Sequence, residues 1–285
     1  MSIYLEVFIF GALLGLPFLY ETRPAFGYCL KFFLYSLVVM FNSLILIPVF
    51  LLRPKSVLNL IVASYFCRWI THVIGVKWML RNGNRLSVQE PCIIVSNHQS
   101  SLDVLGMFQI WSTMGRCTVI AKKGIFWAWP FGLAAWLAGL VFIPRVKTKS
   151  EQAKAVLNSA VEEAAKKQTK VWIFPEGTRK NTGQIHEFKK GAFHSAICSQ
   201  LPITPIVFSR YYFLQRHPMK FDPGTVIIHV LEPISTKGLT LDDLDELTER
   251  VYKKMEKVFE EINRELEVAG KMPKVLQYFT YEKMN

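Results

Sequence analysis

The chain has 285 residues, 51% of them hydrophobic, and a mean hydropathy of +0.23, which is high for a freely soluble enzyme. It carries 34 Lys and Arg residues against 22 Asp and Glu residues, and its formal net charge of +12 favours anionic partners. The basic residues are spread along the sequence and form no zinc-finger, RNP or basic-zipper pattern. This argues against nucleic acid and for an anionic membrane face or a phosphate-bearing substrate.

The five cysteines have neither a CxxC pair nor the spacing of metal ligands. We therefore predict no metal site, and buried, reduced thiols at Cys29, Cys67, Cys92, Cys117 and Cys198. The sequence also lacks the GxGxxG, P-loop and HExxH motifs, which argues against nucleotide hydrolysis and zinc proteolysis.

Two apolar runs stand near the N-terminus. Residues 7–20 are short for a full span and lack the basic flank and cleavage site of a secretory signal, so we predict that they are retained as a membrane anchor. Residues 32–52 hold no charge over 21 positions, about the ~20 that a helix needs to cross a bilayer, and Lys31 and Arg53 bracket them. They predict a membrane-spanning helix, with a buried core helix as the alternative. Whether the first run also crosses is left open.

Residues 56–76 have apolar side chains at close to helical spacing. This pattern predicts an amphipathic helix that lies along the membrane interface or packs on the domain that follows. Residues 78–86 contain an Asn-Gly-Asn sequence and predict a hairpin-like approach to the first buried strand. The resulting division is membrane-anchoring helices over 1–53, an amphipathic connecting helix over 54–80, and a catalytic domain with a C-terminal amphipathic helix over 81–285.

A polar stretch follows the predicted buried strand at residues 92–95, and it reads Asn97-His98-Gln99-Ser100-Ser101-Leu102-Asp103. A histidine accepts a proton near neutral pH, and a carboxylate bonded to its other ring nitrogen fixes its orientation. His98 and Asp103 can fill these two roles if a tight turn brings them together. Ser100 or Ser101 is expected to cap the helix that follows. In the alternative interpretation, His98 is structural and Asp103 is only a helix cap.

Residues 117–121 predict the next strand, which Lys122 follows. Residues 124–144 then form a second uncharged run of 21 residues with three tryptophans, and hydropathy alone would assign them to a membrane span. A single crossing there would place His98 on one side of the membrane and the polar residues further along the chain on the other. A shared site needs all of them on the same side. We therefore expect a buried or partly embedded element at the membrane face of the domain, either in contact with lipid or with a purely core role.

A second polar stretch also follows a predicted strand. Residues 171–174 lead into Pro175-Glu176-Gly177-Thr178-Arg179, again placing charged side chains at a strand end. We expect the two strand ends to share one site.

The remaining elements alternate between helix and strand, which predicts an α/β fold with a mixed sheet flanked by helices. The basic and aromatic tail from Lys271 is not assigned. The other predicted elements are a helix beginning at Ser150, strands over 204–208 and 225–231, and a helix from a capping box at Thr240 and Asp243 to about Leu266.

The two polar stretches resemble the NHxSxxD and FPEGTR blocks of the glycerolipid acyltransferases. Three further blocks of that family occur in the same order and spacing, at Phe142-Ile143-Pro144-Arg145, Phe188-Lys189-Lys190-Gly191-Ala192-Phe193 and Leu201-Pro202-Ile203-Thr204-Pro205-Ile206. Five ordered blocks are more specific than either short motif, and the match covers about residues 90–235. Within the family, the chain is most similar to the 1-acylglycerol-3-phosphate (lysophosphatidic acid) acyltransferases.

The resemblance implies transfer of a fatty acyl group from acyl-CoA to the sn-2 hydroxyl of lysophosphatidic acid, giving phosphatidic acid. Acyl-CoA would be a co-substrate, and no bound cofactor is expected. His98 would remove the hydroxyl proton and Asp103 would stabilise the imidazolium that forms. Arg179 is suited to bidentate contact with the substrate phosphate.

The same resemblance gives the other binding candidates. Lys189 and Lys190 are candidates for the phosphates of the donor, with solvated side chains as the alternative. On the acceptor side, Lys122 and Arg145 are candidates for the phosphate charge, with a solvated side chain as the alternative for Lys122. Glu176 is a candidate for contact with the glycerol backbone or for holding the arginine. Gly177 and Thr178 belong to the same block, and the glycine allows close backbone approach to the ligand.

One other mechanism and two other functions are alternatives. Ser100 or Ser101 could form an acyl-enzyme, although the sequence has no GxSxG motif. A membrane lipid-binding protein without turnover is a second alternative, but it would be expected to have lost His98 or Asp103. An acyltransferase for another lysophospholipid is the third. Resemblance to animal members implies an integral protein of the endoplasmic reticulum membrane with a cytosol-facing site, although a bacterial inner membrane satisfies the same physics.

Overall fold

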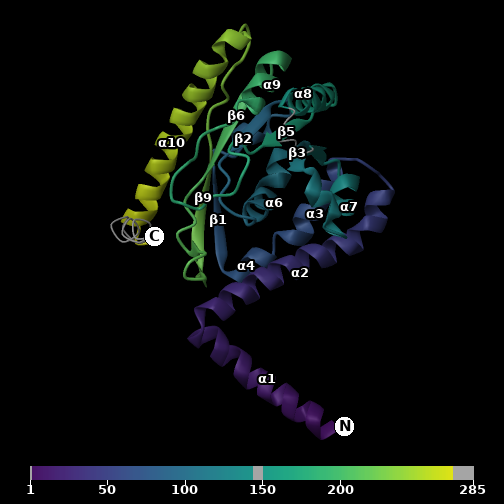
Figure 1. The fold of residues 1–285 in the computed structure, drawn as a ribbon, viewed down its shortest axis with the longest axis vertical. Coiled ribbons are helices and arrows are strands. Elements are labelled where there is room, and N and C mark those ends of the chain that lie inside the picture. The colour runs from purple at the N-terminus through teal and green to yellow at the C-terminus, as the bar shows by residue number, and fades with distance from the viewer. Residues whose placement is uncertain (1, 144–149, 272–285) are drawn as a thin grey trace.

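The computed structural model describes residues 2–143 and 150–271, and it forms a seven-stranded sheet between two layers of helices (Figure 1). The expected α/β fold with a mixed sheet flanked by helices is confirmed. The α-helices are α1 Ser2–Thr22, α2 Pro24–Leu51, α3 Leu58–Cys67, α4 Ile70–Ile74, α5 Asn84–Ser87, α6 Asp103–Met114, α7 Phe131–Leu137, α8 Ser150–Lys166, α9 Gly191–Ser199 and α10 Leu244–Val268. Two 3-10 helices are η1 Lys123–Trp127 and η2 Leu241–Asp243. The strands are β1 Val76–Arg81, β2 Ile93–Ser96, β3 Cys117–Lys122, β4 Val141–Ile143, β5 Lys170–Ile173, β6 Ile203–Phe208, β7 Leu214–Gln215, β8 Lys220–Phe221 and β9 Gly224–Val230.

The main sheet has the strand order β1-β9-β6-β2-β5-β3-β4. Strands β6, β2, β5, β3 and β4 are parallel, whereas β9 is antiparallel to β6 and parallel to β1. The carboxyl ends of five neighbouring strands therefore lie along one edge. Both polar stretches follow strands of this group, β2 and β5, which are direct neighbours.

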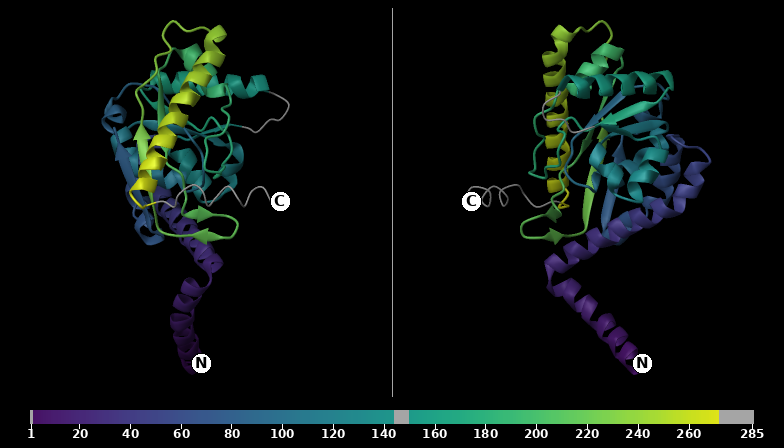
Figure 2. Two further views of the ribbon diagram at one scale, coloured as in Figure 1. Left: turned by 90° about the vertical axis from the view of Figure 1, so that its left-hand side faces the viewer. Right: turned by 45° about the vertical axis from the view of Figure 1, so that its right-hand side comes forward.

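The strands β2, β5 and β6 are buried on both faces, which explains their continuous apolar sequences. On β2, Ile93 and Val95 face the core beneath α8, α9 and α10, and Ile94 faces the core beneath α6 and the N-terminal helices. The two helical layers are seen on opposite sides of the sheet in Figure 2. The predicted capping box at Thr240 and Asp243 is present, and α10 covers the sheet with one apolar face as expected.

Helix α2 is longer than the apolar run that predicted it. It begins at Pro24, so Lys31 lies within it, buried, with Nζ donating a hydrogen bond to the carbonyl oxygen of Phe221 at 2.8 Å. One face packs on the domain, while Phe33 and Phe41 belong to an exposed apolar face. Within the described residues, α2 is the one helix whose length and composition suffice to cross a membrane. Figure 1 shows α2 lying along the domain and α1 extending away from it.

The segment after α2 differs from its prediction in two ways. The amphipathic helix over 54–80 is divided into α3 and α4, and its last residues already form β1. The hairpin-like approach to β2 is wrong, because β1 pairs with β9 and not with β2. Asn82 adopts a positive φ of 54° after β1, and its side-chain amide donates to the carbonyl oxygen of Val230, so the turn leads into α5.

The apolar run at 124–144 is not a membrane span. Over the described residues it is divided among η1, α7 and β4, and α7 has only seven residues. No described helix in this run is long enough for the single crossing that was excluded from the sequence. Trp127 and Trp129 are 75% and 68% exposed, so this element presents aromatic rings at the surface.

Two local predictions need correction. Cys67, Cys92 and Cys117 are buried, but Cys29 and Cys198 are exposed, and all five thiols are free. Cys29 and Cys198 lie on the outer faces of α2 and α9. The number and spacing of cysteines in a sequence do not show which face of a helix a cysteine occupies. No serine side chain caps α6 at its N-cap position, Leu102.

Replacing Gly106 by Ala is expected to destabilise the fold by about 1–3 kcal/mol, because overpacking a filled core forces its side chains to shift. A Cβ atom there would lie 2.6 Å from Cε1 of Phe208 and 2.7 Å from Cζ3 of Trp78. Gly124→Ala is the matched control, because no atom lies within 4 Å of its added Cβ. Chemical denaturation in detergent measures both variants, and equal stabilities would contradict the packing described here.

Candidate active site

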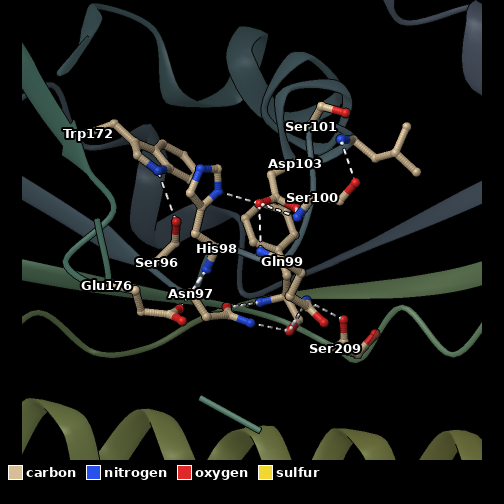
Figure 3. Close-up of polar contacts among 12 residues, drawn as sticks. Ser96, Asn97, His98, Gln99, Ser100, Ser101, Asp103, Trp172, Glu176 and Ser209 are labelled. Carbon is tan, nitrogen blue, oxygen red and sulfur yellow. Dashed lines mark hydrogen bonds and ion pairs between the residues drawn. The ribbon is translucent and has the colours of Figure 1, made fainter. Parts of the chain in front are cut away.

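His98 and Asp103 are brought together at the carboxyl end of β2, as the sequence predicted (Figure 3). The Nδ1 atom of His98 lies 2.6 Å from Oδ2 of Asp103. The turn between them is held by the carboxylate itself, which accepts hydrogen bonds from the backbone N–H groups of Gln99 at 2.9 Å and Ser100 at 3.2 Å. Asp103 is fully buried at the first turn of α6, so its orientation is fixed. With Nδ1–H donated to Asp103, Nε2 of His98 is left as the proton acceptor.

Two buried amides join this loop to the neighbouring strand β6. Asn97 exchanges two hydrogen bonds with the backbone of Phe208, each 2.9 Å long. Gln99 donates to the carbonyl oxygen of Ser209 at 2.9 Å and accepts from the N–H of Tyr211 at 3.1 Å. These bonds continue the sheet beyond the end of β2, and they place His98 on a rigid support.

The loop after β5 holds the backbone of His98 from the other side. The carboxylate of Glu176 accepts the His98 N–H at 2.7 Å, and the Lys180 N–H donates to the His98 carbonyl oxygen at 3.0 Å. The ring of Phe174 stacks on the imidazole, with centroids 3.9 Å apart and an interplanar angle of 21°. The two polar stretches thus form one unit, as predicted. Glu176, expected to contact glycerol or the arginine, instead lies buried between the two loops.

Burial raises the pKa of the Glu176 carboxyl from its ordinary 4.5 to about 7, although the N–H groups of His98 and His186 oppose the shift. A carboxyl with a raised folded-state pKa stabilises the fold fully below pH 4.5, and this stability is lost as the pH rises through about 7.

Glu176→Gln cannot ionise, so its stability relative to the wild type is expected to increase by about 3 kcal/mol between pH 4.5 and pH 8. Unfolding free energies measured for both proteins across this pH range test the prediction. A difference that stays constant with pH would show that Glu176 titrates normally in the folded protein.

A cavity of about 1170 Å³ opens beside His98. This is somewhat larger than the usual volume of ligand pockets for drug-sized molecules, about 300–1,000 Å³. Most of its wall is apolar and comes from α2, α3, α6 and α7, so the 124–144 segment lines it. The polar part of its wall lies at the carboxyl edge of the sheet and contains His98, Thr178 and Arg179.

Other predicted binding residues also reach this cavity. Lys122, Gly177, Lys189 and Lys190 line it, whereas Arg145 lies outside the described residues. Lys190 forms an ion pair with Asp245, with Nζ 2.5 Å from Oδ1. Lys189 and Lys190, which the sequence analysis grouped as donor-binding candidates, therefore differ in their contacts.

The two serines of the loop are not positioned as nucleophiles. Ser100 is buried and its Oγ accepts a hydrogen bond from the Leu102 N–H at 3.3 Å. Ser101 lines the cavity, but among the described contacts of the His98 imidazole there is no hydrogen bond to either hydroxyl. The arrangement therefore favours direct attack by a bound hydroxyl over an acyl-enzyme.

Sequence reasoning missed the contribution of helices α2 and α8 to the site. Tyr35 of α2 lines the cavity and donates a hydrogen bond from its hydroxyl to the Ser101 carbonyl oxygen at 3.1 Å. Lys154 of α8 also lines the cavity. Neither residue lies in a recognisable motif, and the long sequence separation between Tyr35 and Ser101 leaves no local signal.

The comparisons with known proteins agree with this geometry. A family model described as Acyltransferase matches residues 77–209. The human 1-acyl-sn-glycerol-3-phosphate acyltransferase alpha is 38% identical over 249 residues, which are 87% of this chain and 87% of the relative. The human beta protein is 36% identical over 257 residues, covering 89% of this chain and 91% of the relative. The chain belongs to the 1-acyl-sn-glycerol-3-phosphate acyltransferase family.

This family membership confirms the resemblance inferred from the five sequence blocks. The family extends to yeast, where the Saccharomyces cerevisiae 1-acyl-sn-glycerol-3-phosphate acyltransferase is 35% identical over 215 residues, 72% of this chain and 70% of the relative. Among solved structures, the Thermotoga maritima 1-acyl-sn-glycerophosphate (LPA) acyltransferase PlsC is similar with a TM-score of 0.62 and 19% identity, covering 85% of this chain and 97% of that chain. This structural similarity supports the acyltransferase fold.

Proposed function

We propose that the protein transfers a fatty acyl group from acyl-CoA to the sn-2 hydroxyl of lysophosphatidic acid, giving phosphatidic acid. The observation that carries this proposal is the His98–Asp103 pair, 2.6 Å apart, whose histidine lines a largely apolar cavity with Arg179 on its polar edge. The names of the similar proteins point to the same acceptor.

In the proposed mechanism, Nε2 of His98 takes the proton from the sn-2 hydroxyl as its oxygen attacks the thioester carbonyl carbon. Asp103 stabilises the imidazolium, because its carboxylate is buried beside Nδ1. The tetrahedral intermediate then collapses, the bond from carbon to sulfur breaks, and the coenzyme A thiolate leaves and takes the proton from His98. General-base assistance of this kind contributes roughly 10²–10⁴-fold in rate.

The substrate's charged and apolar parts would occupy different walls of the cavity. The planar guanidinium of Arg179 suits bidentate contact with the acceptor phosphate, and Lys122 lies on the same edge of the sheet. The apolar wall from α2 and α7 suits fatty acyl chains.

We also propose that the protein is an integral membrane protein of the endoplasmic reticulum with its site facing the cytosol. The exposed apolar face of α2 supports membrane attachment, as do the exposed rings of Trp127 and Trp129, since tryptophan favours the membrane–water interface. The placement in this organelle rests on the similarity to animal proteins.

The proposal is tested with purified protein in detergent, by measuring thiol release from acyl-CoA in the presence of a panel of lysophospholipids. Activity with lysophosphatidic acid that exceeds activity with choline, ethanolamine and inositol lysophospholipids is the expected result. Preference for one of these others would change the acceptor but keep the reaction. A folded protein that is inactive with every acceptor would instead indicate lipid binding without turnover.

A further inference from the structure

Five basic side chains line the cavity, and they differ in their contacts. They are Lys122, Lys154, Arg179, Lys189 and Lys190. Lys190 is paired with Asp245, and Lys122 and Lys154 have interactions of their own. In the part of the chain that the structure describes, no acidic side chain forms an ion pair with Arg179 or Lys189. Both of these cations are therefore available to an anionic ligand.

Lys189 is positioned by the same loop that carries Arg179. Its backbone N–H donates to the carbonyl oxygen of Pro175 at 2.9 Å. Its side chain lies over Gly177, where an added Cβ would meet Nζ at 3.0 Å, Cε at 3.1 Å and Cδ at 3.3 Å. Gly177 also has a positive φ of 66°, a conformation that favours glycine, and its lack of a side chain leaves room for the side chain of Lys189. The ammonium of Lys189 thus lies beside Gly177, which precedes Arg179 by two residues in the chain, and Lys189 lines the cavity.

Lys190 is directed elsewhere although it is the next residue. It is the N-cap of α9, and its ammonium is held by Asp245 on the first turn of α10. Removing its charge would leave Asp245 without this partner, but would not alter the contacts of the loop between Pro175 and Arg179.

We propose that Lys189 binds the phosphate of the acyl acceptor together with Arg179, and that it does not bind the donor. This inference rests on the proposed function and deepens it by naming a further phosphate-binding residue. A phosphate monoester carries close to two negative charges at pH 7, since its second pKa is about 6. The fork of Arg179 can contact two phosphate oxygens and the ammonium of Lys189 can contact the third.

The experiment compares Lys189→Gln, Lys189→Arg and the control Lys167→Gln in steady-state assays that vary lysophosphatidic acid and acyl-CoA separately. Loss of one charge-assisted hydrogen bond predicts a rise of about 10-fold in the acceptor KM of Lys189→Gln, with the acyl-CoA KM and kcat within about twofold of wild type. Lys189→Arg keeps the charge and is expected to restore most of the acceptor affinity. Lys167→Gln removes an equal charge from an exposed lysine that does not line the cavity, and its acceptor KM is expected to stay within about twofold.

The outcomes separate this inference from the proposed function. If the wild type does not transfer acyl groups to lysophosphatidic acid, the proposed function fails. If the wild type is active and Lys189→Gln raises only the acyl-CoA KM, Lys189 belongs to the donor site and the inference is overturned. An unchanged acceptor KM, or a loss confined to kcat that Lys189→Arg does not restore, also overturns it.

Discussion

Asp103→Asn is expected to lower kcat by roughly 10²–10⁴-fold while the KM for lysophosphatidic acid changes little. The amide keeps the size of the carboxylate, and an amide oxygen in the place of Oδ1 can still accept the Ser100 N–H, whereas the Gln99 N–H loses its acceptor at Oδ2. Its NH₂ group, however, would then face Nδ1 of His98 in place of Oδ2. The imidazole would have to accept at Nδ1 and carry its proton on Nε2, so it could no longer remove a proton from the substrate.

His98→Ala is expected to cause a loss at least as large, because it removes the base itself. Single-turnover rates and steady-state constants, measured with the unfolding midpoint of each variant, separate loss of chemistry from loss of fold. Wild-type turnover in His98→Ala would refute the general-base mechanism. If Asp103→Asn were as active as the wild type, the carboxylate would only cap α6, which is the simpler interpretation of the sequence.

The parts of the site that the sequence predicted are those that local patterns determine. The apolar runs before Asn97 and before Pro175 could be recognised as buried strands because β2 and β5 are covered on both faces. A strand end fixes where the next few side chains can lie, so two polar strand ends on a parallel pair had to meet.

The parts that it did not predict depend on contacts between distant segments. Strand β1 pairs with β9, which lies about half the chain away, so the turn after Arg81 gave a false hairpin signal. Helix α2 was recognised from its length and apolarity, but these do not show that Tyr35 would face the cavity. The burial of Glu176 is also a tertiary effect, because the same carboxylate would be solvated if the two loops were apart.

The buried contact of Glu176 has a consequence for the residues that follow it. Because its carboxylate is bonded to the His98 backbone, and the Lys180 N–H is bonded to the His98 carbonyl oxygen, the segment between them is fixed relative to the imidazole at both ends. Arg179 lies within this segment and lines the cavity. The fold thereby sets the distance between the imidazole of His98 and the guanidinium of Arg179. Lysophosphatidic acid requires such a set distance, because its hydroxyl and its phosphate are a limited distance apart.

Arg179→Ala is accordingly expected to raise the KM for lysophosphatidic acid by about 10–100-fold, since a charged bidentate contact contributes about 1.5–3 kcal/mol or more. Arg179→Lys should recover only part of this affinity, because an ammonium keeps the charge but not the planar fork. The guanidinium is not bonded to His98, so kcat at saturating acceptor should fall much less than in Asp103→Asn. Steady-state assays that vary each substrate in turn measure these effects. An unchanged acceptor KM in Arg179→Ala would place the phosphate elsewhere on the basic edge, whereas a rise in the acyl-CoA KM alone would assign Arg179 to the donor.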